Sequence, residues 1–173
     1  MNVLSRLRPI KTFVFDMDGV LTDGTLLVDE NNKWLRTMNL KDGYALQLAA
    51  KHGYRIIVIS GSEAPQVEER LRKLGLGEVF MKILDKAGFL KTYLQDQKLS
   101  MEETLFMGDD IPDYECMQLA GFRCCPADAA VEIKRISYYI SPLTGGHGCV
   151  RDVIEKVMKL NNHWPLHTTV PSA

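Results

Sequence analysis

The sequence predicts an α/β protein, in which a Rossmann-like parallel sheet carries helices on both faces. Short runs rich in β-branched and aromatic residues alternate with helical patterns, as at residues 55–60 and then 65–74. These runs are apolar throughout, which is typical of strands buried on both faces. The chain has 173 residues, of which 46% are hydrophobic. That is enough for one domain with a substantial core, and we place this domain at residues 1–160.

Each element follows from a local signal. The first strand is expected at residues 11–15, and residues 24–39 predict a protruding β-hairpin because two β-rich runs flank the turn-forming residues 29–32. Asp42 is the expected N-cap of a helix that ends at Gly53. Further strands are expected at residues 55–60, 79–81, 104–107, 121–125 and 138–140. Further helices are expected at residues 65–74, 86–96, 112–120 and 151–159, followed by a loose tail at 161–173.

The octet Asp-Met-Asp-Gly-Val-Leu-Thr-Asp at residues 16–23 is the strongest functional signal. Asp16 and Asp18 lie at alternate positions of an extended segment, so their side chains start on one side. Two carboxylates held together repel each other, which favours a hard metal ion and a nucleophilic oxygen here. Alone, such a segment is more typical of a turn. An EF-hand loop is excluded because Val20 and Leu21 occupy the positions of a ligand and the glycine.

Three further polar features follow strands or begin helices: Ser60, Lys86 and the pair Asp109 and Asp110. Ligands of parallel sheets bind at the carboxyl ends of the strands. We therefore expect these side chains to meet the octet at one edge of the sheet. Four polar features at one edge are hard to explain as turns.

A phosphate monoester is a substrate that these residues could process. Asp16 could attack phosphorus, and Asp18 could protonate the leaving alcohol and then deprotonate water. Ser60 could donate a hydrogen bond to a phosphoryl oxygen, and Lys86 could supply positive charge. Mg²⁺ is the expected cofactor, held by the carboxylates of Asp16 and Asp109 and the backbone carbonyl of Asp18.

This pattern resembles the haloacid dehalogenase (HAD) superfamily of phosphatases. The octet is similar to its first motif, residues 56–61 to its second, Lys86 to its third, and residues 108–113 (Gly-Asp-Asp-Ile-Pro-Asp) to its fourth. Asp110 and Asp113 are expected in supporting positions. Asp113 could orient Lys86 or metal-bound water, and Asp110 could instead cap the next helix.

The gaps between these motifs hold no cap domain. Residues 18–24, 39–45 and 145–152 resemble the capless 3-deoxy-D-manno-octulosonate 8-phosphate (KDO 8-phosphate) phosphatases. The resemblance implies hydrolysis of KDO 8-phosphate in lipopolysaccharide biosynthesis. It also implies a homotetramer, whose neighbouring hairpins and C-terminal segments close the site.

A sugar-acid substrate needs partners for its carboxylate. The residues that we expect to bind substrate are Gly61, Ser62, Arg36, Lys41, Arg70, Lys73 and Arg151. Many relatives carry Arg or Glu where this chain has Ser62. A nine-carbon substrate, KDN or sialic acid 9-phosphate, therefore remains an alternative, although residues 41–44 (Lys-Asp-Gly-Tyr) favour the eight-carbon one.

Other classes of protein fit less well. A net charge of −1 gives no reason to expect nucleic acid, and no apolar run is long enough for a membrane helix. Without a signal peptide or zinc-like cysteine spacing, a reduced cytoplasmic protein is expected. A receiver domain would need a lone Asp after a later strand. A non-catalytic HAD-like oligomerisation module would typically have lost the nucleophile, which is present here as Asp16.

Overall fold

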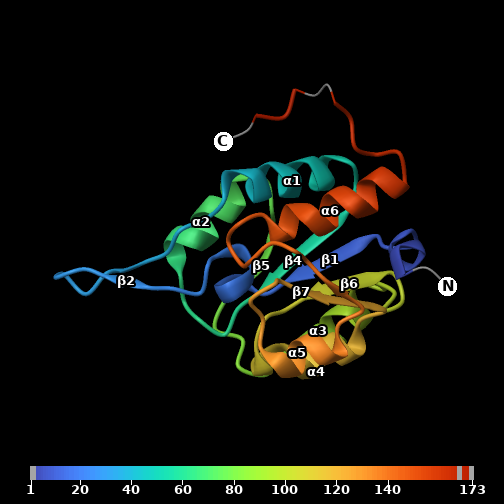
Figure 1. Ribbon diagram of the computed structural model, residues 1–173. Coiled ribbons are helices and arrows are strands. Elements are labelled where there is room, and N and C mark those ends of the chain that lie inside the picture. The colour runs from blue at the N-terminus through green and yellow to red at the C-terminus, as the bar shows by residue number, and fades with distance from the viewer. Residues whose placement is uncertain (1–2, 167–168, 172–173) are drawn as a thin grey trace.

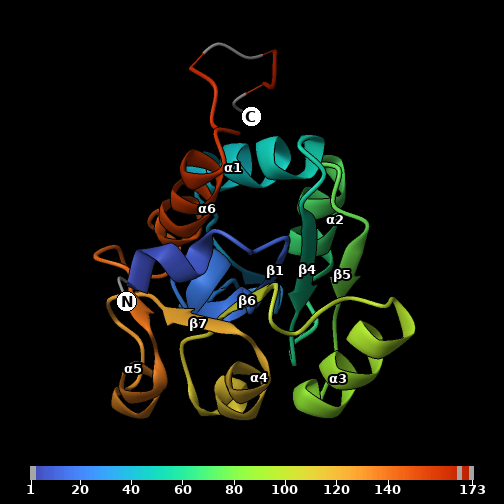
Figure 2. The same ribbon diagram turned by 90° about the vertical axis from the view of Figure 1, so that its right-hand side faces the viewer.

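The computed structural model describes residues 3–166 and 169–171. One parallel sheet of six strands runs through its centre in the order β5-β4-β1-β6-β7-β8 (Figure 2). This confirms the parallel α/β architecture. The strands of this sheet are β1 (Thr12–Phe15), β4 (Arg55–Ile59), β5 (Glu78–Phe80), β6 (Thr104–Met107), β7 (Phe122–Cys125) and β8 (Tyr139–Ile140).

Helices cover both faces of the sheet (Figures 1 and 2). One face carries α1 (Leu40–Lys51), α2 (Pro65–Lys73) and α6 (Cys149–Leu160). The other carries α3 (Lys86–Asp96), α4 (Tyr114–Leu119) and α5 (Val131–Ile136). The sequence did not lead us to expect α5, which is short and has no side-chain N-cap. Within the described ranges, every helix falls short of the length and apolarity needed to cross a bilayer.

The core is divided in two by the sheet. Phe13 and Phe15 of β1 pack with α1, α2 and α6, while Val14 between them packs with α3, α4 and α5. Successive side chains of a strand point to opposite faces, so a strand covered on both sides must be apolar at every position. All four residues of β1 are buried.

The strand β1 lies between β4 and β6, which places the octet at the middle of the sheet. Phe15 at its end pairs with Val58 on one side and Met107 on the other. The segments that follow these three strands therefore emerge beside one another. This is the switch point of a doubly wound sheet, where ligands of such folds bind.

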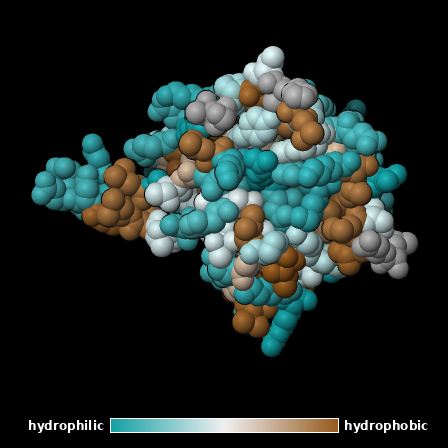
Figure 3. Space-filling view, turned by 45° about the horizontal axis from the view of Figure 1, so that its top comes forward, coloured by the Kyte–Doolittle hydropathy of each residue, from teal (hydrophilic) through white to brown (hydrophobic). Residues whose placement is uncertain are grey.

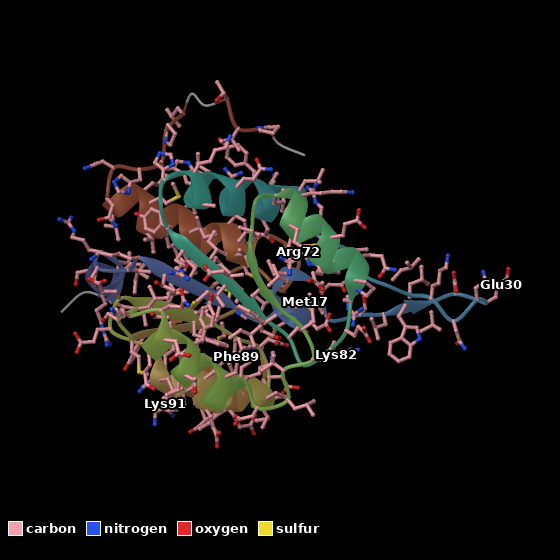
Figure 4. All side chains as sticks on the ribbon, turned by 180° about the vertical axis from the view of Figure 1, so that it is seen from behind. Met17, Glu30, Arg72, Lys82, Phe89 and Lys91 are labelled. Atoms are coloured by element: carbon pink, nitrogen blue, oxygen red, sulfur yellow. The ribbon has the colours of Figure 1, made fainter. Side chains whose placement is uncertain are left out.

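The expected hairpin is present and projects from the body of the protein (Figure 1). Its strands β2 (Leu27–Val28) and β3 (Trp34–Leu35) pair antiparallel, with Glu30 at the tip (Figure 4). Leu27 is 67% exposed and Trp34 is 58% exposed. Figure 3 shows hydrophobic side chains gathered on this projection behind a hydrophilic tip.

The expectation that Asp42 caps α1 is wrong. Asn39 is the N-cap, and its side chain accepts hydrogen bonds from the backbone N–H groups of Lys41 and Asp42. Asp42 lies in the first turn, where its carboxylate turns towards a different helix. It accepts hydrogen bonds from the backbone N–H groups of Gly148 (3.2 Å) and Arg151 (2.7 Å), at the start of α6. Asp42 thus satisfies the free donors of α6 and ties the two helices together.

The described part of the C-terminal tail packs on the domain. Trp164 meets Tyr44 of α1 edge to face, with 6.2 Å between ring centroids. The guanidinium of Arg151 lies 5.3 Å from the ring centroid of Trp164, and Val170 is buried. The tail is therefore less loose than its sequence suggests.

Candidate active site

A pocket of about 310 Å³ lies at the carboxyl ends of β1, β4 and β6. It gathers most of the catalytic and metal-binding candidates from the sequence. The expected site residues that line it are Asp16, Asp18, Ser60, Gly61, Ser62, Lys86, Asp109, Asp110 and Asp113.

Lys86 lies at the buried floor of this pocket, at the start of α3. Its Nζ donates to Oδ1 of Asp16 (2.6 Å) and to Oδ1 of Asp113 (2.8 Å), and its side chain is 7% exposed. Burial opposes the charge of Lys86, but the negative charges of Asp16 and Asp113 outweigh it and raise the pKa of the lysine. Lys86 is therefore a fixed cation that orients the Asp16 carboxylate.

Three carboxylates surround this one lysine. Oxygens of Asp16, Asp109 and Asp113 lie within 4.8 Å of one another. Burial, and then the charge of Asp113, raise the pKa of Asp16 well above its usual value. The same two causes raise the pKa of Asp109 to about 7. Burial and the neighbouring carboxylate both disfavour the ionised forms of Asp16 and Asp109, and a divalent cation would favour them.

The carboxylates differ in what they can offer a cation. Both oxygens of Asp113 accept hydrogen bonds, Oδ1 from Lys86 and Oδ2 from the backbone N–H of Asp109 (3.1 Å). Asp16 and Asp109 keep oxygens that can hold a metal. Hard carboxylate oxygens in a buried, negatively charged pocket are the ligands that Mg²⁺ prefers. The donor set therefore fits Mg²⁺.

A close approach between the backbone of Gly19 and the side chain of Asp109 shapes the pocket. After β1 the chain makes an irregular turn over Met17–Leu21, with Gly19 at a φ of +87°. A Cβ on Gly19 would lie 2.0 Å from Oδ2 of Asp109. Only glycine tolerates both that backbone conformation and that proximity. The glycine of the octet thus lets Asp109 approach the Asp16 side of the pocket.

Thr22 holds this turn together, a role that we did not infer from the sequence. Its Oγ1 accepts from the backbone N–H of Gly19 (3.4 Å) and of Gly24 (3.3 Å), and donates to Oδ1 of Asp18 (3.2 Å). Thr22 is fully buried. The signal that could have revealed it is a hydroxyl residue within a segment of turn-forming residues.

A second support comes from the glycine-rich segment before α6. A Cβ on Gly145 would lie 1.9 Å from the carbonyl oxygen of Gly19, and the backbone N–H of Gly146 donates to the carbonyl of Val20 (2.9 Å). The same segment is held from its other end by Asp42. The motif at residues 145–148 therefore braces the catalytic turn.

Ser60 is buried directly after β4, and its Oγ accepts a hydrogen bond from the backbone N–H of Ser62 (3.1 Å). Accepting this bond leaves the hydroxyl proton of Ser60 for a phosphoryl oxygen. Asp110 accepts from the backbone N–H of Ile111 (2.8 Å) and caps the 3₁₀ helix Ile111–Asp113. The capping role that the sequence left open for Asp110 is therefore the one observed.

Arg36 makes a contact that the sequence did not suggest. Its Nε donates to Oδ1 of Asp18 (2.7 Å), and its Nη2 donates to Oδ2 of the same residue (3.1 Å). Arg36 follows β3, so the base of the hairpin reaches back to the octet. Within one chain, Arg36 is a partner of Asp18.

The other candidate cations lie outside the catalytic pocket. Lys41 and Arg151 line a separate pocket with Trp164, and Lys73 pairs with Glu69 on the surface of α2. Arg70 lines a cleft between α2 and the hairpin. These side chains leave helices that cover one face of the sheet, whereas the catalytic pocket lies at the ends of the strands. A single chain therefore does not bring them to the reacting groups.

Comparison with known proteins places this site in a family. Residues 73–152 match the model of the haloacid dehalogenase-like hydrolases. The 3-deoxy-D-manno-octulosonate 8-phosphate phosphatase KdsC of Escherichia coli (strain K12) is 27% identical over 157 residues, which cover 91% of this chain and 84% of the relative.

Solved structures agree with this match. The 3-deoxy-D-manno-octulosonate 8-phosphate phosphatase from Moraxella catarrhalis, in complex with a magnesium ion, a phosphate ion and KDO, is 28% identical, with a TM-score of 0.89 and 93% of each chain covered. A probable YrbI family phosphatase from Pseudomonas syringae pv. phaseolica 1448a is 31% identical, with a TM-score of 0.89 over 93% of this chain and 92% of that one. The chain therefore belongs to the haloacid dehalogenase-like hydrolases and, among these phosphatases, to the family of the KDO 8-phosphate phosphatases.

Proposed function

We propose that the protein is a Mg²⁺-dependent phosphatase that hydrolyses KDO 8-phosphate to KDO and phosphate through an aspartyl-phosphate. The observation that carries this proposal is the buried arrangement of Asp16, Lys86 and Asp113 with Asp109 beside them. It supplies an oriented carboxylate, a fixed positive charge and oxygens for a cation in one pocket.

The residues divide the reaction as follows. Lys86 holds Oδ1 of Asp16, so Oδ2 attacks phosphorus and the bond from phosphorus to the sugar oxygen breaks. Asp18 gives a proton to that leaving oxygen. Asp18 then takes a proton from water, whose oxygen attacks phosphorus and releases phosphate from Asp16. Ser60 and Lys86 stabilise the charge on the phosphoryl oxygens.

The carboxylates of Asp16 and Asp109, with the backbone carbonyl of Asp18, are the metal ligands in this proposal. When bound, Mg²⁺ neutralises charge on the transferring phosphoryl group. Asp113 holds Lys86 and the backbone of Asp109, so it positions these groups without touching the substrate.

The substrate is inferred from the relatives, one of which was solved with KDO. A role in lipopolysaccharide biosynthesis in the cytoplasm follows from the same inference. The nine-carbon sugar-acid phosphates, KDN or sialic acid 9-phosphate, are the second candidates, because Ser62 lines the pocket where many relatives carry Arg or Glu.

An Asp16→Asn variant tests the mechanism. We expect its kcat to fall by at least about 10³-fold, because the attacking oxygen is replaced by an amide that cannot form the acyl-phosphate. Asp96→Asn, at the exposed end of α3, is the matched control and should keep full activity. Activity of Asp16→Asn equal to that of wild type would contradict the assignment of the nucleophile.

A panel of eight- and nine-carbon sugar-acid phosphates tests the substrate. With Mg²⁺ present, kcat/KM should be highest for KDO 8-phosphate. A preference for a nine-carbon compound would select the second candidate, and equal values across the panel would argue against a dedicated biosynthetic enzyme.

A further inference from the structure

The ion pair between Arg36 and Asp18 carries an inference of its own. The guanidinium faces both oxygens of the carboxylate, at 2.7 and 3.1 Å, in the forked geometry that gives the strongest ion pairs. The Arg36 side chain is 4% exposed, whereas that of Asp18 is 32% exposed. The arginine is thus shielded by the hairpin base, while the carboxylate that it binds faces the catalytic pocket.

This pair, together with Thr22, takes up most of the acceptor positions of the Asp18 carboxylate. Oδ1 accepts from Arg36 and from the hydroxyl of Thr22, and Oδ2 accepts from Arg36. In the proposed function, on which this inference rests, Asp18 must direct one oxygen to the leaving group and then to water. Both oxygens face the guanidinium in this structure. Opening the pair would let the Asp18 carboxylate turn fully to the leaving group and to water.

Arg36 also lies beside a cleft where it could bind a second carboxylate. It lines a cleft of about 260 Å³ between the hairpin base and α2, together with Trp34, Met38 and Arg70. Arg70 makes no ion pair with any residue in the described ranges 3–166 and 169–171. The cleft thus brings two guanidinium groups together, and only one of them has a carboxylate partner. A second carboxylate, supplied from outside, would balance the charges of the cleft.

We propose that Arg36 exchanges partners during the reaction, leaving Asp18 for the carboxylate of the substrate. A sugar acid phosphate carries such a group at the end remote from its phosphate. Its arrival would replace one ion pair by another and free both oxygens of Asp18. A phosphate ester without a carboxylate would leave Asp18 engaged. Arg36 is then a specificity residue, because it couples recognition of the remote end to the readiness of the acid/base.

The simpler alternative is that Arg36 only fastens the hairpin to the body of the protein. The two roles predict different patterns. A fastener affects every substrate alike when it is removed. Removal of an exchanging residue changes the activity in opposite directions for the two kinds of substrate. Activity falls for a sugar phosphate that has a carboxylate, because Arg36 binds that group. Activity is unchanged or rises for a sugar phosphate without one, because Arg36 would otherwise keep Asp18 engaged.

The test compares KDO 8-phosphate with the same compound reduced to an alcohol at its carboxylate, for wild type, Arg36→Gln and Arg36→Lys. The control is Lys33→Gln, an exposed position on the same hairpin. Thermal unfolding and sedimentation establish that each variant keeps its fold and assembly. If Arg36→Gln does not fold, Arg36→Lys, which keeps a charge but cannot pair with both oxygens, supplies the comparison.

We expect wild type to prefer the acid in kcat/KM by roughly 10- to 100-fold, the value of a charged hydrogen-bond pair. Arg36→Gln should lose most of that preference, with a lower kcat/KM for the acid and an unchanged or higher kcat for the alcohol. An equal loss on both compounds would overturn the exchange and leave the proposed function standing. Equal kcat/KM values of wild type for the acid and the alcohol would overturn the proposed substrate class and, with it, the exchange of partners by Arg36.

Discussion

Lys86 shows how strongly one residue can determine the state of its neighbours. It pairs with Asp16 and Asp113 in a buried pocket. Lys86→Met should lower kcat by about 10²-fold or more, because both the orientation of the nucleophile and a charge on the phosphoryl group are lost. The free energy of unfolding should fall by roughly 3–5 kcal/mol, since buried carboxylates are left without their cation. Steady-state kinetics and urea unfolding measure these effects.

The matched control for this prediction is Lys91→Met. Lys91 lies on the same helix, α3, and is exposed (Figure 4). It should behave as wild type in both measurements. Equal effects at the two positions would mean that the loss reflects the helix and not the buried ion pairs.

Asp42 should make stability depend on pH. Burial raises its pKa from 3.8 to about 6, although the backbone N–H groups of Arg151 and Gly148 oppose the rise. The folded protein therefore binds this proton more tightly than the unfolded chain does. The free energy of unfolding should fall as the pH rises from about 4 to about 6, by roughly 3 kcal/mol for this group.

An Asp42→Asn variant isolates that effect, because an amide does not ionise. Its stability relative to wild type should improve by a similar amount, roughly 3 kcal/mol, between about pH 4 and pH 8. Urea unfolding at the two pH values measures the difference, with Asp96→Asn, at the exposed end of α3, as reference. A difference between Asp42→Asn and wild type that stays constant with pH would refute the prediction.

At the scale of elements, the brace between the segment before α6 and the turn after β1 can be tested by adding a single methyl group. Gly145→Ala would place its Cβ 1.9 Å from the carbonyl oxygen of Gly19. The turn must shift to make room, so we expect about 1–3 kcal/mol of lost stability and a lower kcat with little change in KM. Kinetics and thermal unfolding together measure this.

Gly77→Ala is the control for the brace. Gly77 lies between α2 and β5, and its added Cβ would meet nothing within 4 Å. That variant should keep wild-type kcat and stability. If Gly145→Ala also kept wild-type kcat and stability, the glycine-rich segment would not support the catalytic turn.

The strands of the sheet could be predicted from the sequence because each of them has a local pattern of apolar residues. Residues 56–59, for example, are apolar on both faces, as expected for a strand that is buried on both sides. Helix α5 escaped prediction because six residues without a cap carry too little periodic signal. At α1 the prediction of Asp42 as the cap failed because the carboxylate of Asp42 binds the start of α6, which lies far along the chain, and Asn39 caps the helix.

The candidate site was predictable to the same degree. Asp16, Ser60 and Asp109 meet because they follow neighbouring strands, which is a property of topology. The partner of Arg36 could not be predicted, because it depends on the angle at which the hairpin leaves the domain. No sequence pattern specifies that angle.

For the whole molecule, the projecting hairpin predicts assembly. Leu27 and Trp34 leave apolar surface exposed on a two-stranded unit, which is marginally stable alone. We propose that the homotetramer expected from the sequence buries this surface. A Leu27→Ser/Trp34→Ser double variant should sediment as smaller species than wild type. Glu30→Gln, at the hydrophilic tip, is the control and should sediment as wild type. A wild type that sediments as a monomer would contradict the proposed assembly.

The contact between Gly145 and Gly19 has a consequence for biosynthesis of the enzyme. The nucleophile directly follows β1, yet the segment that braces its turn lies far along the chain, directly before α6. Contacts so distant in sequence form late, after the intervening strands have paired. A nascent chain halted before residue 145 would carry every residue of the catalytic pocket and still lack the support of its central turn. Hydrolytic competence is thereby deferred until the glycine-rich segment at residues 145–148 has been translated.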